Sequence, residues 1–280
     1  MKTIIIPIDF SDNAEKALKY ALKLSEKLSA KVFLLHSYYT IHSNVHESLN
    51  NLDAVLQKAE KLSNEQLKEF YNKVSPGAAY NVEFISGGKS VVNEIISQVK
   101  EKNIDLVVMS TEGISSKLGR LFLDTNTSQV VEQASCPVIV IPGDTKEEHM
   151  EMKNMVYATQ YLESDISNLK ALAEIAVLFV SKIEVIHVSE HESEEVKQLL
   201  PEFEQRVKKE VPTIQSSFKL LQGDDVEETL ENYLANNNAD LLIMSTRNRD
   251  FMDNLFEKSI TKSMAQYLSI PLMVFHHNAK

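Results

Sequence analysis

The sequence has almost no cysteine and no concentration of basic residues. Cys136 is the only cysteine among 280 residues, so the chain forms no intramolecular disulfide and no thiolate metal cluster, and a reducing compartment is the expected setting. Its place before Pro137, at the entry to an apolar run, predicts a core position. Asp and Glu outnumber Lys and Arg by 40 to 29, giving a net charge of −11. Because phosphate contacts need clustered Lys and Arg, nucleic acid and anionic membranes are not expected partners.

Long apolar runs are missing as well. The apolar stretch at the start of the chain meets Pro7 and Asp9 after a few residues, which is too short for a signal peptide or a membrane span. Together with the single cysteine, this predicts a cytoplasmic protein. The apolar share of 43% and the charged share of 25% are typical of a globular chain that buries a sizeable core.

Catalytic and metal-binding patterns do not rise above chance in this sequence. Gly87-Gly-Lys-Ser90 resembles the end of a phosphate-binding loop, but the glycine needed five positions before Gly88 is Glu83, which favours a simple turn and helix start. His42 and His46 have the spacing of two metal ligands on a helix. Since no third ligand is fixed by spacing, a solvated insertion is the favoured interpretation.

Short β-branched runs alternate with amphipathic helical stretches. Expected strands are residues 3–8, 31–36, 80–86, 106–110 and 138–141, and expected helices are residues 12–29, 52–74, 90–102 and 125–134. This alternation implies right-handed crossovers and a parallel, doubly wound α/β sheet. Residues 142–149 are polar and rich in turn formers, and they are the best linker candidate.

The second half of the chain repeats the first. His36 and His187 lie 151 positions apart, and Met109 and Met244 lie 135 apart because the second copy is shorter between its second and third strands. Strands are therefore expected again at residues 155–159, 183–188 and 272–275. A repeat of this length predicts two tandem domains, residues 1–144 and 151–280.

Three blocks of the first half resemble the universal stress protein family: Pro7–Ser11, Asp105–Ser110 and Ala134–Ile141. The resemblance implies a Rossmann-like, five-stranded parallel sheet of order 3-2-1-4-5 in each half, and a role in the stress response. Family members commonly pair through the last strand. Residues 138–141 and 272–275 would supply that contact within one chain as an intramolecular pseudo-dimer, and a further homodimer is plausible.

The resemblance also implies a ligand site. Nucleotide-binding members hold adenine near the acid after the first strand and the phosphates on a glycine-rich loop, at the carboxyl edge of the sheet. The matching residues here are Asp9, Ser11, Met109, Ser110, Gly113, Asp124 and Thr125. The implied ligand is ATP or AMP, with Mg²⁺ if it is the triphosphate.

Two of the family's loop glycines are replaced in this sequence. Ser110 replaces the first glycine and Asp124 replaces the third. The spacer of residues 114–123 is ten residues long instead of nine. A carboxylate repels a phosphate charge by ~1 kcal/mol at 4 Å in water, and by more at a lower effective dielectric. Asp124 avoids this if it caps the helix that begins at Thr125, if it is shifted outward, or if Gly119 takes over the close approach.

The second half departs further from the family pattern. Gln160 replaces Asp9, and Ser245, Asn248 and Lys258 replace the three glycines. A structural partner for the first domain is therefore the favoured interpretation of this half. Three functions stay open for the whole chain: a nucleotide-binding stress regulator, a nucleotide-free interaction protein with an unknown protein partner, and a slow ATP hydrolase. Catalysis beyond weak ATP hydrolysis is not expected, because no poised base or nucleophile is evident.

Overall fold

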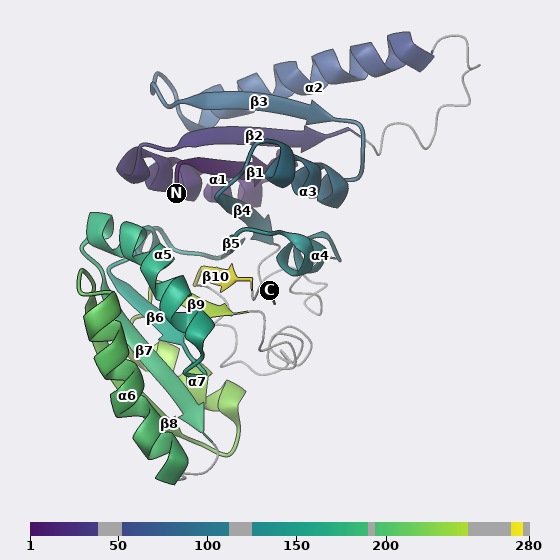
Figure 1. The fold of residues 1–280 in the computed structure, drawn as a ribbon. Helices are drawn as coiled ribbons and strands as arrows, with labels where there is room; N and C mark the ends of the chain where they lie inside the picture. The colour runs from purple at the N-terminus through teal and green to yellow at the C-terminus, as the bar shows by residue number, and fades with distance from the viewer. Residues whose placement is uncertain (39–51, 112–124, 190–193, 246–269, 277–280) are drawn as a thin grey trace. The chain divides into compact units, whose positions relative to one another are not determined.

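The computed structural model describes residues 1–38, 52–111, 125–189, 194–245 and 270–276, and strands alternate with helices along them (Figure 1). The contacts divide the chain into two compact units, the first built from residues 1–110 and 124–138 and the second mainly from residues 139–280. The predicted α/β class is confirmed. The boundaries proposed for the two domains stay a prediction.

The first unit is a parallel sheet with helices on both faces. Its elements are β1 (Thr3–Pro7), α1 (Asp12–Leu28), β2 (Lys31–Ser37), α2 (Leu52–Val74), β3 (Val82–Gly87), α3 (Val91–Glu101), β4 (Leu106–Thr111) and α4 (Thr125–Gln133). The strands lie in the order β3-β2-β1-β4, and each pair of neighbouring strands is parallel. The N–H of Val107 donates to the carbonyl oxygen of Pro137 at 3.0 Å, so the chain approaches its fifth strand beside β4. This is the predicted order 3-2-1-4-5.

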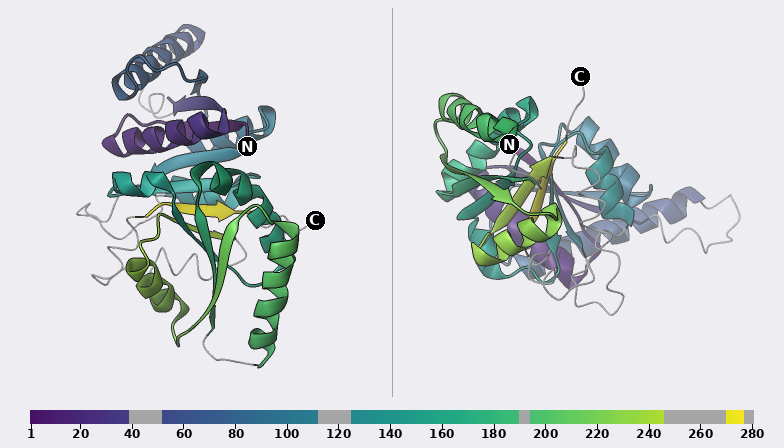
Figure 2. Two further views of the ribbon diagram at one scale, coloured as in Figure 1. Left: turned by 90° about the vertical axis from the view of Figure 1, so that its left-hand side faces the viewer. Right: turned by 90° about the horizontal axis from the view of Figure 1, so that it is seen from below.

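The core of the first unit lies between the sheet and its two helix layers. The middle of β1, Ile4 to Ile6, is 0% exposed because helices cover both faces. Helix α1 packs against α2, and α3 packs against α4 on the opposite face (Figures 1 and 2). Helix α1 begins where the Ser11 hydroxyl accepts the N–H of Ala14, and it ends at Ser29 in the left-handed region.

The second unit repeats this arrangement. Its elements are β5 (Val138–Pro142), η3 (Glu147–Glu151), β6 (Asn154–Ala158), α5 (Glu163–Phe179), β7 (Lys182–Ser189), α6 (Glu194–Glu210), β8 (Gln215–Gln222), α7 (Val226–Asn236), β9 (Leu241–Ser245) and β10 (Leu272–Phe275). The strand order is β5-β10-β9-β6-β7-β8, with parallel pairs from β10 to β8. Read from β8, the strands β8-β7-β6-β9-β10 again follow the order 3-2-1-4-5.

The stretch predicted as a linker is partly helical. Within residues 142–149, the short 3-10 helix η3 begins at Glu147, and it places His149 and Met150 in buried positions. A single helical turn has too few residues to show a periodic pattern, so η3 could not be predicted from the sequence.

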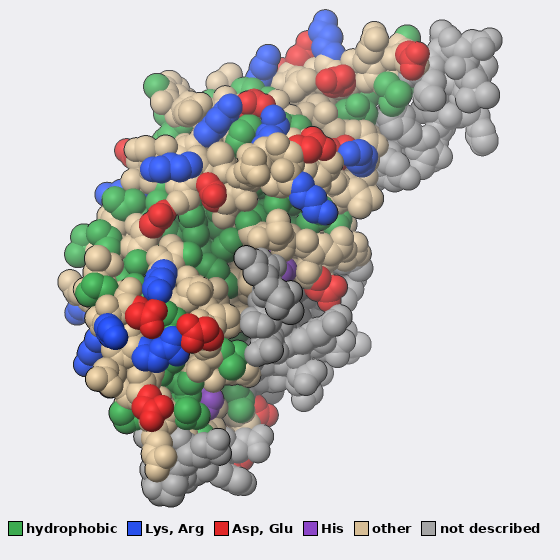
Figure 3. Space-filling model, viewed as in Figure 1, with side chains coloured by type: hydrophobic (Ala, Val, Ile, Leu, Met, Phe, Trp, Pro, Cys, Tyr) green, Lys and Arg blue, Asp and Glu red, His purple; other side chains and the backbone are tan. Residues whose placement is uncertain are grey.

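On the face that Figure 3 displays, Lys and Arg side chains lie among Asp and Glu side chains. Charges of one sign do not gather into a patch on this face. Many of these charges pair, as Arg206 does with Glu163 at 2.7 Å and with Glu210 at 3.3 Å. None of the helices in the described ranges is both long and apolar enough to cross a membrane.

Candidate functional site

A pocket of about 480 Å³ opens at the carboxyl ends of β1, β2 and β4 in the first unit. Its lining comes from the ends of three strands and the starts of two helices: Pro7, Ile8, Asp9, His36, Ser37, Ser90, Val91, Met109, Ser110 and Asn126. The volume is within the usual range for small-molecule sites. The chain leaves β1 toward β2 on one side and returns to β4 on the other, and open α/β sheets bind ligands at such a switch point.

Asp9 follows β1 and has one oxygen available to the pocket. Its Oδ1 accepts the N–H of Ser11 at 3.0 Å and the hydroxyl of Ser11 at 2.6 Å. The Ser11 hydroxyl also accepts the N–H of Ala14 at 3.1 Å, so it serves as the N-cap of α1 and does not line the pocket. Asp9 is exposed, and its Oδ2 has no hydrogen bond to any residue that the structure describes.

Aromatic rings hold the turn that carries Asp9. Phe10 has a φ of 65°, in the left-handed region that residues with bulky side chains rarely adopt. Its ring lies 4.5 Å from the His36 ring and 5.7 Å from the Phe70 ring, centroid to centroid. His36 Nδ1 lies 2.8 Å from the carbonyl oxygen of Ile8. These contacts fix the backbone from Ile8 to Phe10 and thereby direct Asp9 toward the pocket edge.

The sequence did not identify His36 as a site residue, although its repetition as His187 was visible. His187 Nδ1 lies 2.8 Å from the carbonyl oxygen of Thr159, and the His187 ring lies 4.6 Å from the ring of Tyr161, which has a φ of 60°. Phe203 takes the place of the second aromatic ring, 5.3 Å from Tyr161. The same arrangement therefore closes the first turn in both halves.

Strand β4 supplies the opposite wall of the pocket. Met109 is 4% exposed and Ser110 is half-buried, and both line the pocket together with Asp9. Thr125 begins α4, and the next residue, Asn126, lines the pocket. Gly113 and Asp124 lie outside the described residues. Of the predicted site residues, the structure thus brings Asp9, Met109 and Ser110 to one pocket, and the ligand-binding role of all seven stays a prediction.

The described lining contains one carboxylate and neither Lys nor Arg. An anionic ligand would therefore depend on backbone N–H groups and helix ends. Ser90 and Val91 stand at the start of α3, and the Ser90 side chain makes no capping hydrogen bond, so its hydroxyl is available to a ligand. Helices α3 and α4 both begin at the pocket, and each helix N-terminus carries roughly half a positive charge.

The start of α5 in the second half carries a buried hydrogen-bond network that the first half lacks. Asp165, 1% exposed, accepts hydrogen bonds from the hydroxyl of Tyr157 at 2.9 Å and from the hydroxyl of Thr159 at 2.7 Å. Its Oδ2 also accepts the N–H of Leu162 at 3.1 Å. Burial, and next the charge of Asp165, raise the pKa of Tyr157, which keeps its hydroxyl protonated as a donor. At the corresponding positions the first half has Ile6, Ile8 and Ala14.

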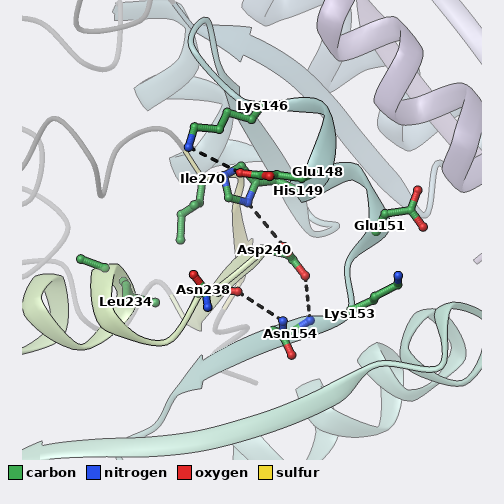
Figure 4. Close-up of a pocket in the computed structure, with 12 residues that line it drawn as sticks. Lys146, Glu148, His149, Glu151, Lys153, Asn154, Leu234, Asn238, Asp240 and Ile270 are labelled. Atoms are coloured by element: carbon green, nitrogen blue, oxygen red, sulfur yellow. Dashed lines mark hydrogen bonds and ion pairs between the residues drawn. The ribbon is translucent and has the colours of Figure 1, made fainter.

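A second pocket, of about 340 Å³, lies at the amino ends of β6 and β9 in the second unit (Figure 4). His149 Nδ1 lies 3.5 Å from Asp240 Oδ1, and Asp240 Oδ2 accepts the N–H of Asn154 at 2.8 Å. Lys146 and Glu148 pair at 3.4 Å. Because these charged groups pair with each other, we interpret the cluster as structural. It holds η3 against the amino ends of β6 and β9.

The remaining motifs have structural roles. The N–H of Lys89 donates to buried Glu94 at 3.0 Å, and the Lys89 ammonium donates to Ser97 at 3.1 Å on α3, as expected for a turn and helix start. Burial, and next the charge of Asp105, raise the pKa of Cys136 to about 12, so this thiol is a core residue. His42 and His46 lie outside the described residues. Within the ranges that are described, no cluster of three or more His, Cys, Asp or Glu could hold a metal ion.

Comparison with known proteins gives consistent results for both halves. The model of the family described as "Universal stress protein family" matches residues 1–142 and again residues 152–276. A universal stress protein of Methanocaldococcus jannaschii is 28% identical over 151 residues, covering 52% of this chain and 85% of that protein. One from Thermus aquaticus is 28% identical over 142 residues, covering 50% of this chain and 98% of that protein.

A solved structure resembles the chain over nearly its whole length. The crystal structure of a universal stress protein from Archaeoglobus fulgidus covers 99% of this chain and 97% of its own, with a TM-score of 0.68 and 16% identity. At that identity the likeness concerns the fold. The curated relatives each span about half of this chain, as a tandem pair requires.

Proposed function

Because the chain belongs to the universal stress protein family, we propose that its first half binds an adenine nucleotide, AMP or ATP, in the pocket at the carboxyl ends of β1, β2 and β4. Binding would serve a regulatory role in the stress response, and the protein would act in the cytoplasm. One member of the family has been solved in complex with cAMP. For this chain, the supporting observation is that Asp9, Met109 and Ser110 line one pocket at the switch point of the sheet.

Each part of the lining suits a part of the nucleotide. Asp9 Oδ2, which has no hydrogen bond to the described residues, accepts hydrogen bonds from N–H or O–H donors of the adenosine moiety. Met109 offers an apolar surface to the base. The hydroxyls of Ser90 and Ser110 and the N-termini of α3 and α4 favour the phosphate, with Mg²⁺ accompanying a triphosphate.

The second half acts in this proposal as a structural partner. Its Asp165 is already saturated by neighbouring donors, and Gln160 stands where the first half has Asp9. In the second unit β5 lies beside β10, which supports pairing of the two halves through their last strands as an intramolecular pseudo-dimer. A further homodimer and a protein partner belong to the same proposal.

A thermal-shift titration with AMP and with ATP, with and without Mg²⁺, tests the ligand. At a ligand concentration of about 100 Kd, binding stabilises the native state by ~2.7 kcal/mol, which corresponds to a rise in Tm of roughly 5–10 °C for a domain of this size. Asp9→Ala should abolish the rise. The matched control Gln160→Ala, at the equivalent position of the second half, should retain it.

Two other experimental outcomes would support a different function. An unmoved melting curve at saturating nucleotide would contradict the proposal and leave the nucleotide-free interaction protein as the better description. A steady release of phosphate from ATP by highly purified protein would indicate the slow hydrolase.

A further inference from the structure

The His36 ring is held in one orientation at the edge of the nucleotide pocket. Its Nδ1 lies 2.8 Å from the carbonyl oxygen of Ile8, and its ring contacts the Phe10 ring at 4.5 Å between centroids, with the planes tilted by 47°. Phe70 of α2 supports Phe10 from 5.7 Å. The ring is half-buried and lines the pocket.

This hydrogen bond decides which ring nitrogen carries the proton. A carbonyl oxygen only accepts, so Nδ1 must be the donor in both the neutral and the protonated ring. In neutral His36 the other nitrogen, Nε2, is therefore an acceptor. Nε2 has no hydrogen-bond partner among the residues that the structure describes, so it is available to a ligand.

Asp9 is the only other titratable group among the described residues that line the pocket or contact the His36 ring. The others are uncharged, coming from β1, β2, α2, α3, β4 and α4: Pro7, Ile8, Phe10, Ser37, Phe70, Ser90, Val91, Met109, Ser110 and Asn126. With the His36 ring neutral, the turn after β1 and the end of β2 thus offer two hydrogen-bond acceptors, Asp9 Oδ2 and His36 Nε2. Two acceptors favour a ligand edge with two N–H donors.

We propose that His36 is a specificity-determining residue, which selects a 6-aminopurine over a 6-oxopurine by presenting an acceptor nitrogen to the pocket that Asp9 also lines. This rests on the proposed nucleotide function of the same pocket. The amino group at position 6 of adenine has two N–H donors, whereas the oxygen of hypoxanthine at that position is an acceptor and faces two acceptors.

The second half provides an internal control. His187 makes the same hydrogen bond and the same ring contact as His36, but Gln160 replaces the acid. The bond from Nδ1 is thus a structural feature of both halves. The combination of this histidine with a carboxylate in one pocket belongs to the first half.

The test measures the affinities of AMP and IMP for the full-length chain by calorimetry. The two ligands carry the same phosphate monoester, so its own titration near pH 6 cancels in their affinity ratio. The wild type should prefer AMP by roughly tenfold. His36→Asn keeps a donor for the carbonyl oxygen of Ile8 but has no atom at the Nε2 position.

The His36→Asn variant should lose roughly three- to tenfold of the AMP preference. His187→Asn should behave as the wild type. If His36 has only a structural role, His36→Asn weakens both ligands equally and leaves the ratio unchanged, which overturns the inference. Absence of any binding of AMP and IMP to the wild type refutes the proposed function itself, so the two failures are distinguishable.

Discussion

At the scale of single residues, one carboxylate joins two strands at the same place in both halves. It is Asp105 in the first half and Asp240 in the second. Asp105 Oδ2 accepts the N–H of Lys2 at 2.6 Å and the N–H and hydroxyl of Thr3, each at 3.0 Å. Asp240 Oδ2 accepts the N–H of Asn154 at 2.8 Å. Burial acts to raise the pKa of Asp105, but the donors of Lys2 and Thr3 outweigh it and hold this pKa below its usual value.

Asp105→Asn should therefore destabilise the fold by about 1–3 kcal/mol at neutral pH, because a neutral amide oxygen accepts the hydrogen bonds of Lys2 and Thr3 more weakly than the carboxylate does. A carboxyl group whose folded-state pKa is lowered stabilises the fold at pH values above its unfolded pKa, and this contribution is lost as the pH falls through the folded pKa. Urea unfolding at pH about 7 and about 3 should show the difference from wild type narrowing in acid.

Asp224→Asn is the matched control, since Asp224 is exposed and makes no hydrogen bond within the described structure. It should change the free energy of unfolding by less than about 0.5 kcal/mol. An Asp105→Asn variant as stable as the wild type at neutral pH would show that the strand start is held by its backbone alone.

At the scale of elements, the first helix of each half ends at a residue in the left-handed region. These equivalent residues are Ser29 and Val180. Ser29 has a φ of 52° and Val180 a φ of 55°. Val180 is 73% exposed, so its side chain gains little from burial. A β-branched side chain is poorly suited to this conformation, whereas glycine adopts it without a steric cost.

Val180→Gly should stabilise the protein by about 1 kcal/mol, the net of relieved strain and the greater freedom of glycine in the unfolded chain. The expected rise in Tm is roughly 2–4 °C. Ser29→Gly, the matched control, should gain less because serine has no branched Cβ. A lower Tm for Val180→Gly would mean that the exposed valine makes stabilising contacts that outweigh its backbone strain.

Periodic elements were predictable from the sequence, and elements or contacts made by single turns were not. Helix α2 and strand β10 begin and end at the predicted residues because long apolar periodicity and flanking turn residues define them. Asp9 and Ser110 meet at one pocket because the carboxyl ends of parallel strands share an edge. The bond from His36 to Ile8 depends on the fold and on no local pattern.

The two halves share one fold at the scale of the whole molecule, yet their carboxyl edges have diverged. The first half has a pocket lined by Asp9, one of whose oxygens accepts no hydrogen bond from the part of the chain that the structure describes. In the second half the carboxylate of Asp165 is buried and receives hydrogen bonds from Tyr157, Thr159 and Leu162. A buried carboxylate with its donors in place is costly to rearrange, because each lost hydrogen bond would leave a charge without compensation.

One nucleotide should therefore bind per chain, although the chain has two domains of the same fold. Calorimetric titration of the full-length protein with AMP is expected to give a stoichiometry near one, and Asp9→Ala should remove all measurable binding. Gln160→Asp restores the acid of the second half but leaves the network of Asp165 intact, so it should add no second site. A stoichiometry near two for the wild type would show that this network yields to the ligand, and that the second half is a binding domain in its own right.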